Sequence, residues 1–201
     1  MEAPSPIVVI LAGPNGAGKT TSARAIVREA LGVDEFVNAD ILAQGLSGFD
    51  PERAAMAAGR IMLARLRQLA SQRSRFAFET TLASRTFAPW IEELISTGYQ
   101  FHLVFLWLPD AEMAVARVSA RVSEGGHSVP EETIRRRYHS GLSNFFTLYR
   151  SMAMTWEFWD NSSEAGLRLI AAGSRDVACR VDDSTTWDHV VAVFGSGGRN
   201  T

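Results

Sequence analysis

Cysteine is almost absent from this chain of 201 residues, and the single Cys179 has no partner for an internal disulfide. Its apolar neighbours Val177 and Ala178 predict a packed thiol rather than a reactive nucleophile. An excess of charge of one sign is also missing, since 20 Lys and Arg residues face 22 Asp and Glu residues. The formal net charge of -2 argues against a nucleic-acid partner bound through a general basic surface.

Long hydrophobic runs and a basic leader are missing as well. No apolar stretch is long enough to cross a bilayer, and residues 1–6 carry no basic region of the kind that begins a signal peptide. We therefore expect a cytoplasmic protein without a membrane partner. The length and the 46% hydrophobic content predict one domain over residues 1–201, with a flexible tail at about 195–201.

The most informative feature that is present is a glycine-rich segment directly after the apolar run from Ile7 to Ala12. Its pattern is G-x-x-x-x-G-K-[ST], in which small residues let backbone N–H groups wrap around the triphosphate of a nucleotide such as ATP. Lys19 supplies a positive charge toward the β- and γ-phosphates, and the Thr20 hydroxyl is a ligand for Mg²⁺. The predicted nucleotide-binding residues are Gly13, Pro14, Asn15, Gly16, Ala17, Gly18, Lys19, Thr20 and Thr21.

Strand and helix patterns alternate along the rest of the chain. Helical spacing of apolar residues follows the glycine-rich loop at once, which places the phosphates at a helix N-terminus. The almost continuously apolar run at 101–108 is typical of a strand that is covered on both faces. The alternation predicts a three-layer α/β fold with a mostly parallel central sheet and helices on both faces.

Polar side chains stand where two predicted strands end. Residues 35–40 are expected to form a short strand that ends at Asp40, and residues 76–81 a strand that ends with Glu79 and Thr81. The carboxyl ends of parallel strands face the ligand crevice of such a sheet. These three side chains are therefore expected beside the bound phosphates.

Two helices joined by the glycine pair at 125–126 carry several arginines, among them Arg121. We predict that this hairpin, at about 117–140, is a lid that excludes water and brings arginines onto a transferring phosphoryl group. At 100° per residue, Arg136 points away from the buried stripe of the second helix, whereas Arg135 and Arg137 flank it. We favour Arg137 as the phosphate ligand, and the alternative is that all three arginines are solvated surface charges.

The last third of the chain is rich in tryptophan and phenylalanine. Residues 156–159 are expected to belong to the core rather than to a base-stacking platform, and Asn161, in the polar turn that follows, is a candidate for reading adenine. Residues 167–173 predict the closing strand of the sheet, and residues 187–194 predict a final helix.

The order of these features resembles the zeta toxin family, in particular its compact bacterial members. The motifs that carry the resemblance are Gly-Pro-Asn-Gly-Ala-Gly-Lys-Thr-Thr, Asn-Ala-Asp, Phe-Glu-Thr-Thr, Arg-Val-Ser-Glu-Gly-Gly-His-Ser-Val-Pro, Ile-Arg-Arg-Arg-Tyr and Asp-Asn-Ser. The resemblance covers the chain from Ile7 to about Ser174 and implies a P-loop kinase fold. It also implies ATP- and Mg²⁺-dependent phosphorylation of UDP-N-acetylglucosamine, with a small antitoxin that blocks the nucleotide site.

The resemblance assigns roles to individual residues. Asp40 matches the aspartate that activates the acceptor hydroxyl, and Glu79 and Thr81 match the Glu-x-Thr that holds the substrate. Arg121 and Arg137 take the part of the lid arginines and act with Lys19 on the phosphates.

Two of these roles have structural alternatives. Asp40 is also suited to cap the following turn or to hold Mg²⁺ through water. Glu79 is also suited to pair with a neighbouring arginine such as Arg60 or Arg85.

Departures from the larger toxins of that family leave the acceptor open. The chain is shorter, has no obvious added antitoxin-binding segment, and shows Pro109-Asp110 where a metal-binding acid is expected after the 101–108 strand. A kinase of an antibiotic, a nucleoside or another metabolite is the first alternative function. A nucleotide-binding switch without chemistry is the second.

Overall fold

The computed structural model describes residues 5–48, 51–126 and 128–195. Its strands are β1 (Ile7–Ala12), β2 (Glu35–Val37), β3 (Phe76–Thr80), β4 (Gln100–Trp107), β5 (Thr155–Asp160), β6 (Arg168–Ser174) and β7 (Val177–Val181). The α-helices are α1 (Lys19–Ala23), α2 (Ala39–Leu46), α3 (Pro51–Ser71), α4 (Ala88–Ser96), α5 (Ala111–Ser123), α6 (Glu131–Asn144), α7 (Arg150–Met152) and α8 (Ser184–Val190). Three π-helical segments extend helices, namely η1 (Arg24–Ala30), η2 (Phe145–Tyr149) and η3 (Val191–Gly195).

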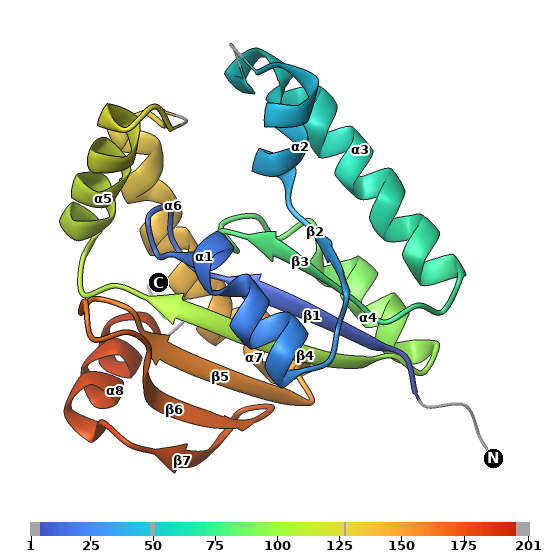
Figure 1. The fold of residues 1–201 in the computed structure, drawn as a ribbon. Helices are drawn as coiled ribbons and strands as arrows, with labels where there is room; N and C mark the ends of the chain where they lie inside the picture. The colour runs from blue at the N-terminus through green and yellow to red at the C-terminus, as the bar shows by residue number, and fades with distance from the viewer. Residues whose placement is uncertain (1–4, 49–50, 127, 196–201) are drawn as a thin grey trace, which may run out of the picture.

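The strands form a seven-stranded sheet in the order β2-β3-β1-β4-β5-β6-β7. The first five are parallel, and β6 and β7 join as an antiparallel extension. In Figure 1 the helix formed by α1 and η1 lies in front of the sheet, while α4 and α6 lie behind it. The predicted α/β fold with a mostly parallel sheet and helices on both faces is therefore confirmed.

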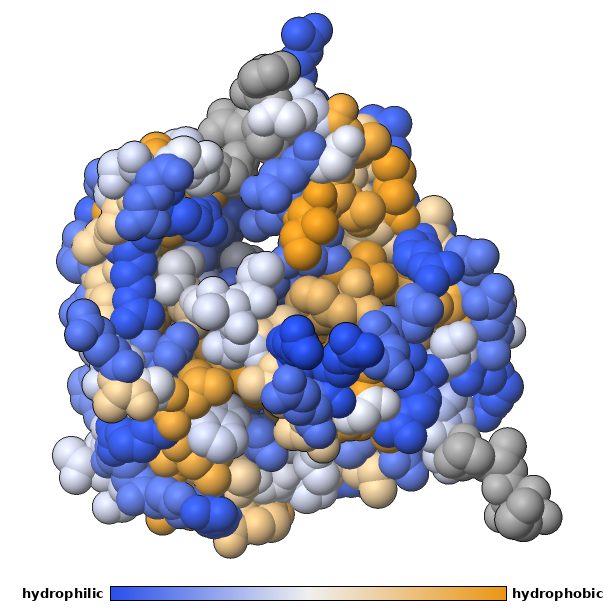
Figure 2. Space-filling model, in the orientation of Figure 1, coloured by the Kyte–Doolittle hydropathy of each residue, from blue (hydrophilic) through white to orange (hydrophobic). Residues whose placement is uncertain are grey.

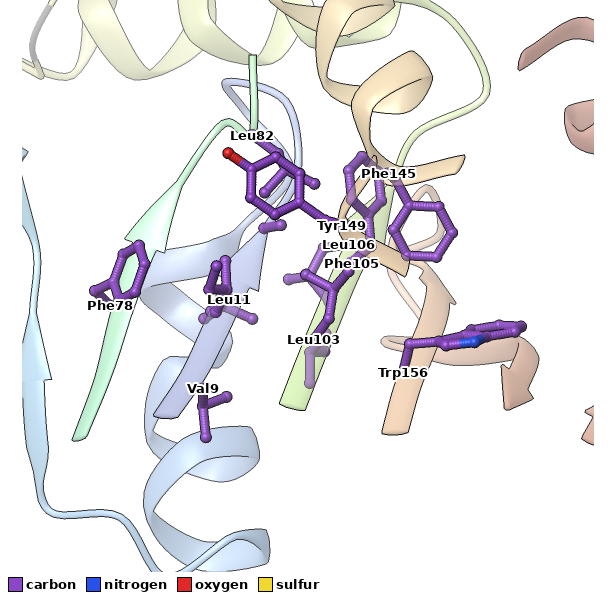
Figure 3. Close-up of a cluster of buried hydrophobic side chains, with 14 of the residues drawn as sticks. Val9, Leu11, Phe78, Leu82, Leu103, Phe105, Leu106, Phe145, Tyr149 and Trp156 are labelled. Carbon is purple, nitrogen blue, oxygen red and sulfur yellow. The ribbon is translucent and has the colours of Figure 1, made fainter. Parts of the chain in front are cut away.

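The core lies along the two central strands. In β1 the residues from Val8 to Ala12 are fully buried, as expected for a strand with helices on both faces. Figure 3 shows Phe105 of β4 beside Phe145 of η2, with the Trp156 ring next to them. Their ring centroids lie 5.2 Å (Phe105–Phe145) and 5.9 Å (Phe145–Trp156) apart, so helix and sheet interlock through aromatic side chains.

The predicted strand at 35–40 is shorter than expected. β2 ends at Val37, and Asp40 lies in the first turn of α2, a helix that the sequence patterns did not indicate. The reason is a helix cap: Asn38 Oδ1 accepts hydrogen bonds from the backbone N–H groups of Asp40 (2.7 Å) and Ile41 (3.2 Å). Asp40 therefore reaches the edge of the sheet from a helix and not from a strand.

The prediction of a buried thiol at Cys179 is wrong. Cys179 lies in β7, which forms the edge of the sheet, and all five residues of this strand are exposed. Among the described strands β7 pairs with β6 alone and forms the edge, so β6 is not the closing strand that the sequence indicated. The predicted tail falls almost wholly on residues 196–201, which lie outside the described residues.

In the part of the chain that the structure describes, every helix is too short or too polar to cross a membrane.

Candidate active site

The glycine-rich loop joins β1 to α1 and fits tightly against its neighbours. Gly16 and Gly18 have φ angles of 78° and 75°, a region that residues with a Cβ rarely adopt. A Cβ on Gly18 would stand 2.5 Å from Nδ2 of Asn161, and one on Gly16 would stand 3.0 Å from the Ala114 carbonyl oxygen. The loop conformation therefore depends on glycine at both positions.

Lys19 is the buried cation of this loop, with 6% of its surface exposed. Its Nζ donates a hydrogen bond to the Pro14 carbonyl (2.8 Å) and lies 3.7 Å from Oε1 of Glu79. Burial lowers the pKa of Lys19, and the negative charges of Glu79 and Asp40 oppose that shift. The ammonium thus lies buried in the first turn of α1, the helix that follows the glycine-rich loop, where an anion is favoured.

Glu79 at the end of β3 lies in a polar cluster with α1 and with the cap of α2. Its Oε2 accepts hydrogen bonds from Thr20 Oγ1 (2.8 Å) and Asn38 Nδ2 (2.6 Å). Glu79 therefore forms its ion pair with Lys19, and not with an arginine such as Arg60 or Arg85. The cluster joins the P-loop helix to two neighbouring strand ends.

A cavity of about 350 Å³ lies over the P-loop between α5 on one side and α2 on the other. Figure 2 shows this face hollowed between the two sides, with polar surface around the hollow and apolar surface over α2 and α3. The residues that line it are Asn15, Gly16, Gly18, Lys19, Thr20, Thr21, Asn38, Asp40, Ile41, Gln44, Glu79, Arg117, Arg121 and Gly126. The predicted loop, Asp40, Glu79 and Arg121 thus meet around one space.

A second cavity of about 290 Å³ adjoins the first and shares Asn15, Lys19, Asn38, Asp40 and Glu79 with it. Its other wall comes from α3, from the segment after β3 and from the start of the α6 region. These further lining residues are Ala39, Ala55, Met62, Thr80, Thr81, Phe87, Val129 and Arg137. Asp40 and Lys19 therefore stand at the boundary between two spaces.

The three consecutive arginines of α6 have different surroundings. Arg135 forms ion pairs with Glu112 (2.8 Å) and Glu131 (2.9 Å), and Arg136 is exposed. Arg137 is half-buried at the second cavity, and its Nη1 lies 3.5 Å from Oδ1 of Asn15. Burial lowers the pKa of Arg137, and the negative charge of Asp40 opposes this shift. Of the three, Arg137 is the one that faces the site.

Asn161 uses its side chain on the protein itself. Its Nδ2 donates to the Ala17 carbonyl of the P-loop (2.8 Å), and Arg117 of α5 donates to the carbonyls of Asn161 (2.7 Å) and Ser162 (2.9 Å). Arg117 thus connects α5 to the turn after β5, and Asn161 connects that turn to the loop. In this arrangement Asn161 supports the P-loop backbone, whereas the sequence made it a candidate for contact with adenine.

Sequence reasoning missed two residues of the site. In the sequence, Asn38 stands out only as part of Asn-Ala-Asp, although an Asn two residues before an acid at a helix start is also a capping signal. In the sequence, Arg117 is one of several arginines of the predicted hairpin and has no distinguishing signal of its own. Its partners are backbone carbonyls 44 and 45 residues further along, and no local pattern indicates them.

The family model of the AAA domain matches residues 8–140, about two thirds of the chain. The chain belongs to the AAA domain family. The match begins in β1 and ends within α6, so it contains the P-loop, Asp40, Glu79 and the arginines of α5 and α6. A curated relative of this AAA domain, an uncharacterized protein of Haemophilus influenzae, is 27% identical over 130 residues, which are 65% of this chain and 91% of that protein.

Solved structures with the same fold include chains of the two following systems. A chain of the AvrRxo1-ORF1:AvrRxo1-ORF2 complex is 18% identical with a TM-score of 0.70, and the match covers 92% of this AAA domain protein and 63% of that chain. A chain of the PezAT toxin-antitoxin system of Streptococcus pneumoniae is 14% identical with a TM-score of 0.65, covering 100% of this chain and 82% of that one. At these identities the likeness shows a shared P-loop kinase fold.

Proposed function

We propose that this protein is an ATP-dependent phosphotransferase that moves the γ-phosphoryl group to a hydroxyl of UDP-N-acetylglucosamine. The observation that carries the proposal is the position of Asp40 and Lys19 at the boundary of two adjoining cavities. The first cavity has the P-loop of a nucleotide site. The second brings an acceptor against the same carboxylate and the same cation, which is the arrangement a phosphoryl transfer needs.

The proposed transfer assigns one task to each charged group. The acceptor hydroxyl gives its proton to the Asp40 carboxylate while its oxygen forms a bond to the γ-phosphorus. The bond from that phosphorus to the bridging β–γ oxygen breaks, and ADP leaves. Lys19 of the P-loop stabilises the negative charge on the transferring group, together with Arg121 and Arg137 from the two lid helices.

The residues present fit Mg²⁺ at the phosphate side of the first cavity. Thr20 Oγ1 and Glu79 Oε2 lie 2.8 Å apart and offer a hydroxyl and a carboxylate, the oxygen donors that this ion prefers. When bound, Mg²⁺ neutralises charge on the β- and γ-phosphates. Glu79 also lines the second cavity, so its sequence-based role with Thr81 in holding the acceptor is retained in the proposal.

A small antitoxin protein is the proposed partner. The likeness to a chain of the PezAT toxin-antitoxin system supports this part of the proposal. A protein that covers the first cavity would exclude ATP, so co-purified antitoxin should lower ATP affinity in calorimetry. An antitoxin that binds and leaves ATP affinity unchanged would contradict a blocking role.

The proposal is tested by transfer of labelled γ-phosphate from ATP to UDP-N-acetylglucosamine, beside a mixed metabolite extract. Asp40→Asn should slow transfer by about 10²- to 10⁴-fold with little change in ATP affinity. Glu92→Gln, at an exposed position of α4, is the matched carboxylate control and should behave as the wild type. Label on another compound would refute the sugar-nucleotide acceptor, and transfer retained by Asp40→Asn would refute the base.

Glu79→Gln separates the two roles of Glu79. A metal role predicts that Mg²⁺ no longer raises ATP affinity, which is measured by calorimetry with and without the ion. An acceptor role predicts a higher KM for the acceptor and an unchanged Mg²⁺ effect on ATP binding.

A further inference from the structure

A third cavity lies between α3 and α4, away from the phosphates. Its volume is about 430 Å³, larger than either cavity of the candidate active site. It is lined by Leu63, Leu66 and Arg67 of α3, by Thr86 and Phe87 before α4, and by Pro89, Trp90 and Glu93 of α4. None of these side chains apart from Phe87 lines the two cavities described above.

This groove adjoins the second cavity. The Phe87 side chain lines both spaces, and in α3 Met62 lines the second cavity while its neighbour Leu63 lines the groove. The wall formed by α3 runs from Ala55 to Arg67, which at 1.5 Å per residue is about 18 Å. A single sugar ring bound at Asp40 would occupy only one end of this length.

One wall of the groove is aromatic and is held in place by packing on β3. Phe87 and Trp90 both pack against Phe78 of β3, with ring centroids 5.0 Å and 6.2 Å away. Both rings are only partly buried, so each keeps surface that faces the groove. A flat ring can stack on such a wall without ordering a mobile side chain.

Opposite charges stand at the rim of the same groove. Arg67 and Glu93 are exposed residues of α3 and α4, and Thr86 adds a hydroxyl. A guanidinium donates hydrogen bonds and a carboxylate accepts them, which suits the polar edge of a heterocycle. Because one cation and one anion stand at the rim, their charges favour neither an anion nor a cation.

We propose that the groove between α3 and α4 is the distal half of the acceptor site and holds an aromatic or heteroaromatic ring at the non-reacting end of the acceptor. This inference rests on the proposed function, because Asp40 marks the reacting end. The acceptor is then an extended molecule, with a hydroxyl at Asp40 and a planar ring beside Phe87 and Trp90. The groove contributes binding and specificity, and the phosphoryl transfer itself stays at Asp40.

Substitutions at two positions of α3, Leu63 and Ile61, test the groove. Leu63 and Ile61 are both 42% exposed and lie in the same helix, but only Leu63 lines the groove. Leu63→Glu places a carboxylate in the groove, and Ile61→Glu is the matched control. Leu63→Trp, which narrows the groove without adding charge, is the second variant.

The first readout is binding, measured on full-length protein whose ATP site is filled with a β,γ-imido analogue of ATP and Mg²⁺. The probes are UDP-N-acetylglucosamine by calorimetry and 8-anilinonaphthalene-1-sulfonate by fluorescence. Leu63→Glu should weaken each probe that the wild type binds by about tenfold or more, because the carboxylate must be desolvated beside the ring. Ile61→Glu should bind as the wild type, and equal binding by Leu63→Glu, or a wild type that binds neither probe, overturns the proposal.

The second readout is kinetic and separates the two proposals. Leu63→Glu and Leu63→Trp should raise the KM for the extended acceptor, with kcat and the KM for ATP nearly unchanged. N-acetylglucosamine without the nucleotide should be equally poor with wild type and variants. Absence of any transfer by the wild type refutes the proposed function, whereas the fluorescence result on Leu63→Glu still decides the groove.

Discussion

At the scale of single residues, Asn161 makes a prediction that separates loop support from base recognition. Asn161→Ala removes the hydrogen bond to the Ala17 carbonyl, so the P-loop loses one of its fixed points. Affinity for ATP and for GTP should fall together, by about five- to tenfold, which corresponds to roughly 1 kcal/mol. Isothermal titration calorimetry with both nucleotides measures the two affinities.

Ser162→Ala is the control for this variant, because Ser162 forms its hydrogen bonds to Arg117 and Asp160 through its backbone. It should leave both affinities near those of the wild type. If Asn161→Ala weakens ATP and spares GTP, then Asn161 reads adenine as its sequence position suggested.

Single residues of the site were predictable from the sequence where the chemistry is local. The P-loop requires glycine for its backbone angles and Lys19 for its charge, and one short sequence pattern contains both. The contacts of Arg117 and Glu79 were not predictable, because their partners are distant in the sequence. The roles of Asp40 and Thr81 in catalysis and acceptor binding stay predictions.

At the scale of elements, His102 gives the pairing of β4 with β5 a dependence on pH. His102 stands opposite Thr155 in the register, and its Nδ1 lies 2.6 Å from the Thr155 hydroxyl. Burial lowers the pKa of His102 below its usual value, while the Glu157 charge opposes the shift and the Arg75 charge adds to it. The folded state therefore resists protonation of this ring.

The sign of the pH effect follows from that lowered pKa. As pH falls below about 6.5, the unfolded chain takes up a proton at His102 before the folded protein does, so stability decreases. As the pH rises, stability should increase until the imidazole of His102 is neutral in the unfolded chain as well. His102→Gln should flatten this part of the curve in urea titrations between pH 5 and pH 8, whereas His189→Gln, at an exposed position of α8, should keep it. An unchanged slope in His102→Gln would contradict the assignment.

Helices and strands were predictable from the sequence where their buried residues recur at a regular spacing. β4, which is buried from Leu103 to Trp107, and the buried stripe of α6 formed by Ile134, Tyr138 and Leu142 follow this rule. α2 has only eight residues and includes Gly45, so its helical signal is weak and its capping by Asn38 decides it. β7 is exposed along its whole length, so it lacks the alternation that marks a half-buried strand.

At the scale of the whole molecule, an aromatic cluster packs the carboxy-terminal helix α8 against β5 and η2. Trp187 of α8 stacks on Trp156 of β5, with centroids 5.3 Å apart and planes at 14°, and it contacts Phe146 (5.5 Å) and Phe158 (5.7 Å). Trp187 is 7% exposed. The residues of this cluster line neither cavity of the candidate active site, so we expect the cluster to serve stability and not nucleotide binding.

Trp187→Ala should therefore lower stability without changing ATP affinity. Loss of a buried tryptophan costs about 3–5 kcal/mol, which for a domain of this size lowers Tm by roughly 6–20 °C. Saturating ATP should raise the Tm of the variant by about as much as that of the wild type, because the P-loop is intact. Differential scanning fluorimetry with and without ATP measures both effects, and Val193→Ala, at a position that is 56% exposed, is the control that should leave Tm unchanged. A Tm like that of the wild type in Trp187→Ala would mean that the cluster does not hold the carboxy-terminal elements, and a lost ATP shift would mean that it supports the nucleotide site.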